Sequence, residues 1–456
     1  MENKVKKLSF PKRPFRVSGG AHVPHHKNTA DMESVIMPSP KEVTIPMHQH
    51  IGAPCKVCVA VGDSVCVGTV IGDSDAFVSA PIHSSVSGTV KKITKITMPS
   101  GAQCDAVVIE SDGLDTPDPS LTPPVVENTE DLVKAIRNSG LVGLGGAGFP
   151  AHVKLNVPKG KDIDTLLINC AECEPYITSD HREIVENSWA VMSGVYTVAE
   201  ILDIERIIIA IEDNKPDAIR VMKDIADNEK YDPEDKVRVL PLKTEYPQGA
   251  EKVLIKACTG REVPVGKLPS DVGCIVMNVA SISFLSNYIK TGMPLVKKRI
   301  TVDGSAVSEP KNVIVPIGTA ISDVIEFCGG YKEEPRKLLM GGPMMGLALL
   351  DDSLPVLKQN NAILAFAKKE AKLYEATDCI RCGRCVSACP MRLMPTKLCA
   401  AVKLSDFELM QQNHIMNCME CGSCAYVCPA HRHIVQNIRL GKSRLREHLN
   451  KQKGDK

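Results

Sequence analysis

Eight cysteines near the C-terminal end have the spacing of iron–sulfur cluster ligands. They form two runs of one pattern, in which three cysteines lie three positions apart, a fourth follows four positions later, and a proline comes next. The runs are Cys379, Cys382, Cys385 and Cys389, and Cys418, Cys421, Cys424 and Cys428. Three closely spaced thiolates can surround one [4Fe-4S] cluster, and the fourth cysteine of such a run normally ligates the other cluster. We therefore expect two clusters with crossed ligands, namely Cys379, Cys382, Cys385 with Cys428, and Cys418, Cys421, Cys424 with Cys389.

Disulfides and zinc are the alternative interpretations of these cysteines. Disulfides need an oxidising compartment, and nothing in the sequence points to one. Zinc would take four ligands at each of two sites, which eight cysteines could supply. The repeated spacing with its closing proline is that of iron–sulfur ligation, so the pattern favours a protein that moves electrons one at a time.

A second candidate site is a glycine-rich segment, GLVGLGGAGFP, at residues 140–150. Its glycines Gly143, Gly145, Gly146 and Gly148 fall within six residues and leave the backbone N–H groups uncovered by side chains. Such a loop can approach a phosphate closely and donate hydrogen bonds to it. The segment departs from the strict G-x-G-x-x-G of dinucleotide folds, so the loop alone indicates only a phosphate.

Length and composition limit the elements that can position these sites. The chain has 456 residues, enough for about three domains, with 43% hydrophobic and 24% charged residues, as in soluble globular proteins. No apolar run approaches the ~20 residues needed to cross a bilayer, and the basic N-terminus lacks the apolar segment of a signal peptide. We therefore expect a cytoplasmic protein whose 18 cysteines are reduced. The net charge of +1 gives no field for nucleic acid.

Residues 1–34 form a predicted N-terminal arm, and residues 35–112 a predicted barrel-sandwich β domain of the lipoyl type. Short Val- and Ile-rich runs alternate there with turn residues, as in a small sandwich or barrel. A carrier domain would need a lysine at the hairpin tip, where this chain has His83-Ser-Ser-Val86, so we interpret the domain as scaffold. Whether a metal binds Cys55, Cys58 and Cys66, or His22, His25 and His26 of the arm, stays open.

The segment from 128 to 295 has the pattern of a doubly wound α/β domain. It follows a Pro- and Asp-rich linker at 112–128. Residues 165–169 and 206–211 are continuous apolar runs typical of buried parallel strands. Helical patterns occur at 128–138, 182–202 and 215–228.

The remaining segments divide into four. Residues 296–350 have the hairpin and short helix of a β-grasp domain of the soluble-ligand-binding (SLBB) type. Residues 351–375 are predicted to be a linker, and residues 376–440 a two-[4Fe-4S] ferredoxin domain. The spacer at 396–414 has helical periodicity, so we expect that domain to be α-helical. Residues 441–456 are interpreted as a basic, solvated tail.

Several motifs resemble the NADH-binding flavoprotein subunit of respiratory complex I. The glycine loop with Lys154 resembles its flavin loop. Asn169-Cys-Ala-Glu-Cys-Glu-Pro175 is similar to its Asn-Ala-Asp-Glu-Ser-Glu-Pro, with Cys173 where serine usually stands. Tyr246-Pro-Gln-Gly-Ala-Glu251 is similar to its Tyr-x-x-Gly-Glu-Glu, with alanine in place of the first glutamate, and Asn278 falls at its downstream Asn-Val.

The order of the parts, together with the arm motif GGAHVPHHK at residues 19–27, resembles the C subunits of the Rnf (Rsx) family of ion-translocating ferredoxin:NAD oxidoreductases. The second resemblance is to the cobalamin reductases of diol-utilisation compartments. These begin near the glycine loop, so the barrel here argues against them. A scaffold with purely structural clusters is a third interpretation, from a different class.

The resemblance implies noncovalent FMN, with NAD(H) as substrate, and a flavin is a natural converter between hydride and single-electron chemistry. It also implies a protein held at the cytoplasmic side of the membrane by the other subunits of the complex, with ferredoxin reached through one of them. The glycine loop would bind the FMN phosphate with Lys154 as countercharge. Asn169 and Glu172 would bind the ribityl chain or ring, and Glu174 and Glu251 the nicotinamide nucleotide. The residues implied in cofactor binding are Gly143, Gly145, Gly146, Ala147, Gly148, Lys154, Asn169, Glu172, Glu174, Tyr246, Gly249, Glu251 and Asn278.

Overall fold

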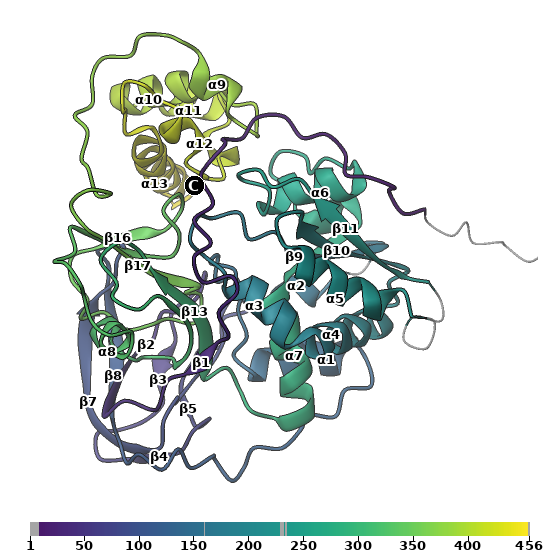
Figure 1. Ribbon diagram of the computed structural model, residues 1–456, viewed down its shortest axis with the longest axis vertical. Coiled ribbons are helices and arrows are strands. Elements are labelled where there is room, and N and C mark those ends of the chain that lie inside the picture. Colours follow the sequence, from purple (N-terminus) through teal and green to yellow (C-terminus); the bar gives the residue numbers. More distant parts are fainter. Residues whose placement is uncertain (1–8, 159, 229–231, 233–234, 455–456) are drawn as a thin grey trace, which may run out of the picture.

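The structure, a computed structural model, describes residues 9–158, 160–228, 232 and 235–454. Residues 1–8 of the predicted arm and 455–456 of the predicted tail lie outside the described residues. Figure 1 shows the barrel and the β-grasp domain on one side, the α/β domain on the other, and a small helical domain at one end. The predicted multidomain α/β architecture is confirmed in this order of domains.

The barrel domain consists of two antiparallel sheets packed on each other. One sheet has the order β2-β8-β7-β4 and the other β3-β5-β6. Alternate residues such as Val43 and Ile45 point into a common core and are fully buried, which is the period-2 pattern of a strand with one wet face. The strands are β2 (Glu42–Pro46), β3 (Lys56–Val57), β4 (Ser64–Val65), β5 (Val70–Asp73), β6 (Ile82–His83), β7 (Gly88–Thr97) and β8 (Gln103–Ser111).

The α/β domain has a four-stranded parallel sheet of order β11-β10-β9-β12. Its strands are β9 (Thr165–Cys170), β10 (Arg206–Glu212), β11 (Val237–Leu242) and β12 (Cys274–Asn278). Both faces of the sheet are covered. Ile207 and Ile209 of β10 lie in one hydrophobic core, and Ile208 between them lies in the other. This explains the continuous apolar strands and confirms the doubly wound prediction.

Helices on the two faces complete the α/β domain. They are α1 (Thr129–Asn138), α2 (Ala151–Leu155), α3 (Ser179–Glu186), α4 (Ser188–Ile201), α5 (Pro216–Ala226), α6 (Glu251–Thr259) and α7 (Val279–Thr291), with a 3-10 turn η1 (Pro269–Val272). Asn128 caps α1 as expected, because its side chain accepts from the Asp131 amide. The single helix predicted at 182–202 is wrong. Asn187 leaves the helical conformation and separates α3 from α4.

The β-grasp domain is larger than predicted. Its six-stranded sheet has the order β1-β14-β13-β17-β15-β16. Strand β17 lies inside this sheet, so residues 362–366 are core and not linker. Strand β1, expected in the barrel, pairs with β14 of the β-grasp sheet instead. The elements are β1 (Val35–Ile36), β13 (Lys297–Asp303), β14 (Lys311–Pro316), α8 (Ile321–Phe327), β15 (Lys337–Met340), β16 (Leu347–Leu349) and β17 (Ala362–Phe366).

The cysteine-rich domain is helical, as predicted. It contains α9 (Arg384–Ser387), α10 (Pro395–Leu404), α11 (Phe407–Gln412), η2 (Ile415–Asn417), α12 (Ser423–Tyr426) and α13 (Ile434–Gly454). Residues 441–454 of the predicted tail continue α13 without a break. Leu445 is fully buried in the core of this domain, so this stretch is a packed helix with a basic outer face.

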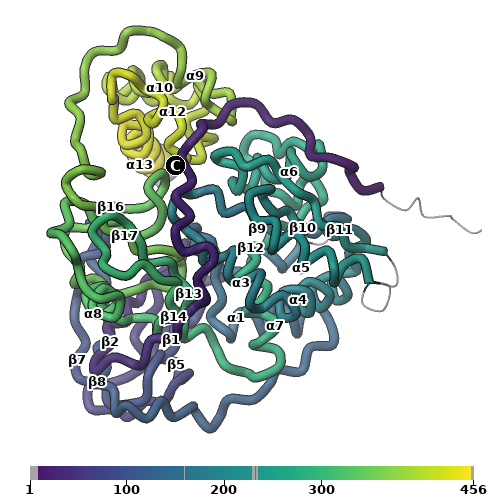
Figure 2. Tube along the Cα trace, in the orientation of Figure 1, coloured from purple at the N-terminus to yellow at the C-terminus, as the bar shows by residue number. Residues whose placement is uncertain are grey.

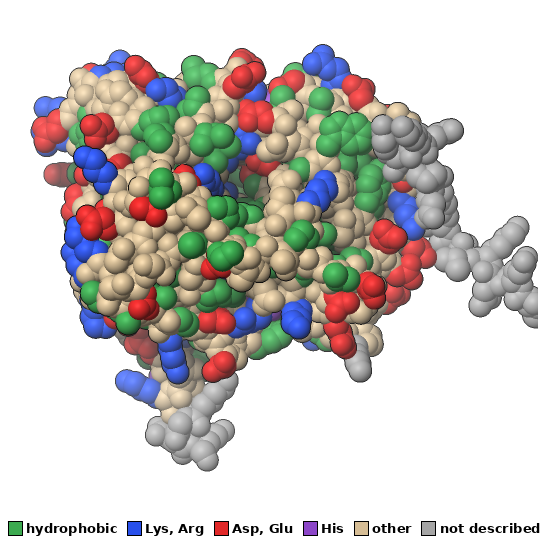
Figure 3. All heavy atoms as spheres, turned by 90° about the horizontal axis from the view of Figure 1, so that it is seen from below, with side chains coloured by type: hydrophobic (Ala, Val, Ile, Leu, Met, Phe, Trp, Pro, Cys, Tyr) green, Lys and Arg blue, Asp and Glu red, His purple; other side chains and the backbone are tan. Residues whose placement is uncertain are grey.

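The N-terminal arm ties the domains together. Figure 2 shows it running along the α/β domain and then between that domain and the rest of the molecule. The Phe15 amide donates to the Ala257 carbonyl of α6, and Ala21 forms a β-bridge with Tyr246. On the face shown in Figure 3, basic and acidic side chains are intermixed, in keeping with the net charge of +1.

Candidate cofactor sites

The glycine loop forms a tight turn at the start of the α/β domain. The Gly143 amide donates to the Phe149 carbonyl at 2.8 Å, and the Gly148 amide donates to the Gly143 carbonyl at 3.2 Å. Gly146 has a φ of +111°, and a Cβ there would meet no atom within 4 Å. The tip of the loop therefore faces open space in a backbone conformation that glycine favours.

Three successive amides of this loop are available to a ligand. Within the described part of the chain, the N–H groups of Gly145, Gly146 and Ala147 donate to no protein acceptor, and all three residues are exposed. Consecutive free N–H groups form a concave site for an anion. The loop thus fits the phosphate of a flavin mononucleotide, as the sequence predicts.

Two asparagines lie side by side next to the loop, because Asn169 and Asn278 pair in register at the carboxyl ends of β9 and β12. The Asn169 amide nitrogen donates to the Gly249 carbonyl at 2.8 Å. The Asn278 oxygen accepts from two amides at the start of α7. A Cβ on Gly145 would lie 2.9 Å from Asn278 Nδ2, so the loop packs directly on this side chain. Ligands of open α/β sheets bind at this edge.

Asp180 lies behind Asn278 and was not predicted. Its Oδ2 accepts from Asn278 Nδ2 at 2.6 Å, while its buried Oδ1 has no partner in the described structure. Burial, and then the nearby Glu172, raises the pKa of Asp180 to about 7. No local signal marks this residue, because the polar run at residues 179–183 has the composition of a solvated helix start although it is buried.

Lys154 follows the glycine loop on α2 and meets Glu251 at the start of α6. The two charged atoms lie 2.7 Å apart, and about a third of each side chain is exposed. Lys154 also donates to the Val276 carbonyl of β12 at 3.3 Å. The structure therefore brings together the loop, Lys154, Asn169, Gly249, Glu251 and Asn278.

Three other predicted residues have their polar groups engaged within the protein. Glu172 accepts from the amides of Asp180 and His181 and so caps the start of α3. Glu174 accepts from the backbone of the β-grasp domain, and the Tyr246 hydroxyl donates to the Cys421 carbonyl. Glu174 and Tyr246 lie where domains meet.

The barrel and the segment before β17 support the glycine loop from outside the α/β domain. The Ile51 amide donates to the Gly148 carbonyl at 2.9 Å. A Cβ on Gly148 would lie 3.3 Å from Gln359, whose Oε1 is buried without a partner in the described structure. Gln359 was missed because its segment was interpreted as a linker.

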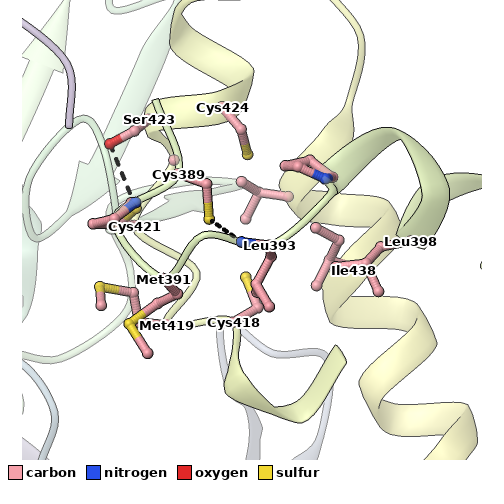
Figure 4. Close-up of a pocket in the computed structure, with 14 residues that line it drawn as sticks. Cys389, Met391, Leu393, Leu398, Cys418, Met419, Cys421, Ser423, Cys424 and Ile438 are labelled. Atoms are coloured by element: carbon pink, nitrogen blue, oxygen red, sulfur yellow. Dashed lines mark hydrogen bonds between the residues drawn. The ribbon is translucent and has the colours of Figure 1, made fainter. Parts of the chain in front are cut away.

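One set of four cysteines surrounds a cavity in the cysteine-rich domain. Cys389, Cys418, Cys421 and Cys424 line it together with apolar side chains such as Leu398 and Ile438. Figure 4 shows the four thiols arranged about this space. Cys389 comes from the first run and the other three from the second. The cavity thus has the composition of the crossed set expected from the sequence.

The second set shows the reciprocal arrangement. Burial, and then the neighbouring Cys428 thiol, raises the pKa of Cys385, with Cys379 also contributing. Cys428 of the second run is therefore close to cysteines of the first. Cys379 and Cys382 are exposed, whereas Cys421 and Cys424 of the other set are buried.

The two runs have the same backbone conformation. Positive φ angles recur at Arg381 (57°) and Glu420 (61°), and again at Gly383 (77°) and Gly422 (82°). Each run then enters a one-turn helix, α9 or α12. The left-handed backbone conformation costs a non-glycine residue free energy, and residues that adopt it cluster at functional sites.

Backbone amides already point at cysteine sulfurs. The Leu393 amide donates to Cys389 Sγ at 3.3 Å, and the Glu420 amide donates to Cys418 Sγ at 3.4 Å. Such hydrogen bonds tune cluster potentials. Among the described residues, no three His, Cys, Asp or Glu side chains are placed to hold a single metal ion. Each set takes three cysteines from one run and the fourth from the other, which is the ligand arrangement of two-cluster ferredoxins.

Family models match four segments of the chain. They are the RnfC barrel sandwich hybrid domain at residues 15–114, the Nuo51 FMN-binding domain at 136–287, the SLBB domain at 299–348 and the 4Fe-4S dicluster domain at 371–429.

Curated relatives match nearly the whole chain. The C subunit of the proton-translocating ferredoxin:NAD(+) oxidoreductase complex of Clostridium ljungdahlii is 46% identical over 432 residues, 93% of each chain. The C subunit of the Na(+)-translocating complex of Acetobacterium woodii is 42% identical, over 93% of this chain and 96% of that protein. The chain belongs to this family of C subunits. The C subunit of the ion-translocating oxidoreductase complex of Rhodobacter capsulatus is 39% identical, over 96% of this chain and 85% of that protein.

Solved structures agree with the fold. An NAD+-reducing [NiFe]-hydrogenase chain in the H2-reduced state superposes with a TM-score of 0.50 at 16% identity, over 70% of this chain and 62% of that one. The match to the flavin-binding and dicluster families makes FMN and iron–sulfur clusters the cofactors of this protein. In the described part of the chain, no helix has both the length and the apolar character of a membrane span.

Proposed function

We propose that this chain is the peripheral subunit of a membrane-bound ion-translocating ferredoxin:NAD+ oxidoreductase, and that it transfers electrons between NAD(H), FMN and two [4Fe-4S] clusters. One observation carries the proposal. The chain contains a loop of free amides at the ligand-binding edge of a parallel sheet, and it also contains two four-cysteine sets. A packed junction connects the domains that hold them. The name of the Clostridium ljungdahlii relative agrees with this assignment.

In this proposal the protein binds and orients the cofactor from one edge of the sheet. The amides of Gly145, Gly146 and Ala147 hold the FMN phosphate, and Lys154 contributes positive charge beside Glu251. Asn169 and Asn278 lie side by side next to the loop, at the edge of the sheet where ligands of open α/β sheets bind. Bound FMN supplies the conversion between two-electron exchange with NAD(H) and single-electron exchange with clusters.

The position in the cell follows from the same assignment. We place the chain at the cytoplasmic side of the membrane, where NAD(H) is found, and we expect the other subunits of the complex to hold it there. Ferredoxin then exchanges electrons with this chain through a partner subunit. The second candidate, a soluble reductase of the cobalamin-reductase type, is disfavoured by the barrel and arm at residues 15–114, since that class begins near the glycine loop.

The proposal is tested by the substitution Gly146→Asp. A carboxylate at this position lies where the phosphate must approach, so repulsion and steric exclusion both act against FMN. Gly62→Asp is the matched control, because Gly62 also has a positive φ (+95°), is exposed, and has open space around its Cβ position. Flavin fluorescence after denaturation and total iron are measured on both variants.

We expect Gly146→Asp to lose at least ~90% of its FMN, while its iron content stays at the wild-type value. A fall from about 90% to about 10% occupancy at the same free FMN is an ~80-fold loss of affinity, or about 2.6 kcal/mol. The Gly62→Asp variant should keep both cofactors. Wild-type FMN in the Gly146→Asp variant would place the flavin elsewhere.

A further inference from the structure

Four segments of the chain meet at one buried junction between the α/β domain and the cysteine-rich domain. Its members are Ala21 and Val23 of the arm, Tyr246 of the α/β domain and Cys421 of the cysteine-rich domain, with Met344 of the β-grasp domain packed against them. We call this set the four-segment junction. It joins the candidate flavin domain to the cavity lined by Cys389, Cys418, Cys421 and Cys424.

Tyr246 is fixed at both ends within the junction. Its side chain is 2% exposed, and its hydroxyl donates to the Cys421 carbonyl at 2.6 Å. Its own carbonyl accepts from the Ala21 amide at 2.8 Å. A Cβ on Gly20 would lie 2.5 Å from the Tyr246 carbonyl oxygen, and one on Gly19 would lie 2.7 Å from the Cys389 carbonyl carbon. The arm therefore fills the space between Tyr246 and a cluster cysteine without room for a side chain.

Glu174 holds the β-grasp side of the junction. Its two carboxylate oxygens accept from the amides of Met344 at 3.0 Å and Met345 at 2.9 Å. A Cβ on Gly342 would lie 2.2 Å from Glu174 Oε2, so the loop is as close to the carboxylate as a chain can come. Both oxygens thus accept hydrogen bonds inside the protein, and these bonds fix the carboxylate against the β-grasp loop.

The same loop then contacts the cysteine-rich domain. A Cβ on Gly422 would lie 2.8 Å from the Met344 carbonyl oxygen, and Arg439 of α13 donates to the Met345 carbonyl at 3.4 Å. Glu174 therefore helps to position the second cysteine run, because it holds Met344 and Met345, and Met344 contacts Gly422 of that run.

A short series of contacts connects the candidate flavin site to this junction. The Gly249 carbonyl accepts from Asn169 at 2.8 Å, and the Gly249 amide donates to Cys173 Sγ at 3.5 Å. Cys173 packs against the four-segment junction. Electron tunnelling slows exponentially with distance and is faster through packed protein than across water. The distance that the junction holds between the candidate flavin site and the cysteine set therefore sets the rate of electron transfer between them. The other cysteine set is the exposed one, with Cys379 and Cys382 at the surface.

We propose that Glu174 and Tyr246 are positioning residues for electron transfer, which dock the cluster of Cys389, Cys418, Cys421 and Cys424 against the flavin domain and make it the redox partner of the flavin. This rests on the proposed function. Oxidation of NADH to NAD+ releases one proton to solvent and two electrons. A cluster held by Cys389, Cys418, Cys421 and Cys424 would accept these electrons one at a time, and a cluster held by the other set, which has Cys379 and Cys382 at the surface, would pass them to the next redox protein.

The experiment uses the full chain loaded with FMN and both clusters, with the variants Tyr246→Phe and Glu174→Gln. Tyr331→Phe is the matched control, because its hydroxyl donates to Asp352 in the β-grasp domain, away from the junction. Stopped-flow absorbance separates flavin reduction by NADH from cluster reduction. Potentiometric EPR reports the midpoint potential of each cluster.

We expect unchanged FMN, iron and NADH KM in all three variants. Cluster reduction should be several-fold slower in Tyr246→Phe, which removes one hydrogen bond of the junction, and slower still in Glu174→Gln, which weakens two. One cluster potential should fall in Tyr246→Phe because a donor beside Cys421 is lost. The control should match the wild type.

Two results would overturn the proposal. A raised NADH KM in Glu174→Gln with an unchanged cluster-reduction rate would make Glu174 a nucleotide contact. Cluster reduction and potentials in Tyr246→Phe equal to those of Tyr331→Phe would remove the role of the hydroxyl. A wild-type chain whose bound flavin is not reduced by NADH would instead contradict the proposed function.

Discussion

Lys358 is a buried lysine at the contact of the barrel with the α/β domain. Its side chain is 1% exposed, and its ammonium donates to the carbonyls of Pro81 at 2.6 Å and Gly140 at 2.8 Å. Burial lowers the pKa of Lys358 from 10.5 to about 7. The unfolded chain therefore binds a proton between pH 7 and 10.5 that the folded chain does not.

We expect the stability of the wild type relative to Lys358→Met to increase with pH across this window. The slope is at most about 1.4 kcal/mol per pH unit, and it is positive because the unfolded state binds more protons. Denaturant unfolding followed from pH 7 to 9.5 measures the difference. Lys92→Met, an exposed position on β7, is the control and should show no such slope. A pH-independent difference for Lys358→Met would contradict the buried, neutral lysine.

The crossed assignment of cysteines gives a second prediction. Cys389 shares a cavity with Cys421, and Cys428 lies close to Cys385, so each fourth cysteine belongs to the site of the opposite run. We expect Cys389→Ser to change the EPR signal that Cys421→Ser changes, and Cys428→Ser to change the one that Cys382→Ser changes. Pairing within each run would refute the crossing.

The candidate residues of both cofactor sites stand out in the sequence because their patterns are local. Cysteine spacing and a glycine loop depend on neighbours within about ten residues. The roles of Glu174 and Tyr246 depend on partners far away in the chain, at Met344 and Cys421. No local pattern encodes such partners, and the same holds for the buried carboxylate of Asp180.

At the scale of elements, one lysine side chain adds an anchor to the arm. Lys27 Nζ donates to the carbonyls of Glu172 at 2.7 Å, Glu174 at 2.9 Å and Ile177 at 2.5 Å. These carbonyls lie in the segment between β9 and α3, which contains Cys173 and Glu174 of the junction. The arm is thus anchored beside the four-segment junction.

Lys27→Met should loosen the arm, because it leaves three carbonyls without their donor. We expect a loss of about 3 kcal/mol in local stability, which raises the opened fraction about 100-fold. Trypsin cleavage after Arg16, an exposed arm residue, measures the opening. Lys41→Met, which removes an exposed lysine outside the arm, should leave the cleavage rate unchanged. Equal cleavage in both variants would show that Lys27 does not anchor the arm.

Elements with a clear period were predicted well, and elements defined by distant pairing were not. Strands β9 and β10 are continuous apolar runs and lie where expected. Strand β17 is also apolar, but a long connection separates it in sequence from β13 and β15, the strands with which it pairs. Its segment was therefore interpreted as a linker. The basic residues after 441 hid the apolar stripe of α13, where Leu445 packs in the core.

At the scale of the whole molecule, the order of domains along the chain differs from their contacts in space. The barrel and the segment at Gln359 support the glycine loop, and the β-grasp loop at Met344 contacts both the α/β and the cysteine-rich domains. The two scaffold-like domains therefore hold the two cofactor-binding domains at a fixed separation. This arrangement is what a chain that passes electrons internally requires.

The most direct test of this account is reduction by NADH under anaerobic conditions, followed by low-temperature EPR of the frozen protein. Wild type and Gly62→Asp, both with FMN, should show [4Fe-4S]+ signals, beginning with the cluster that Cys421→Ser alters. Gly146→Asp, with its clusters present and FMN absent, should show none. Cluster signals of wild-type size in the FMN-free variant, or reduced flavin without any cluster signal in the wild type, would contradict electron transfer from NADH through FMN to the clusters.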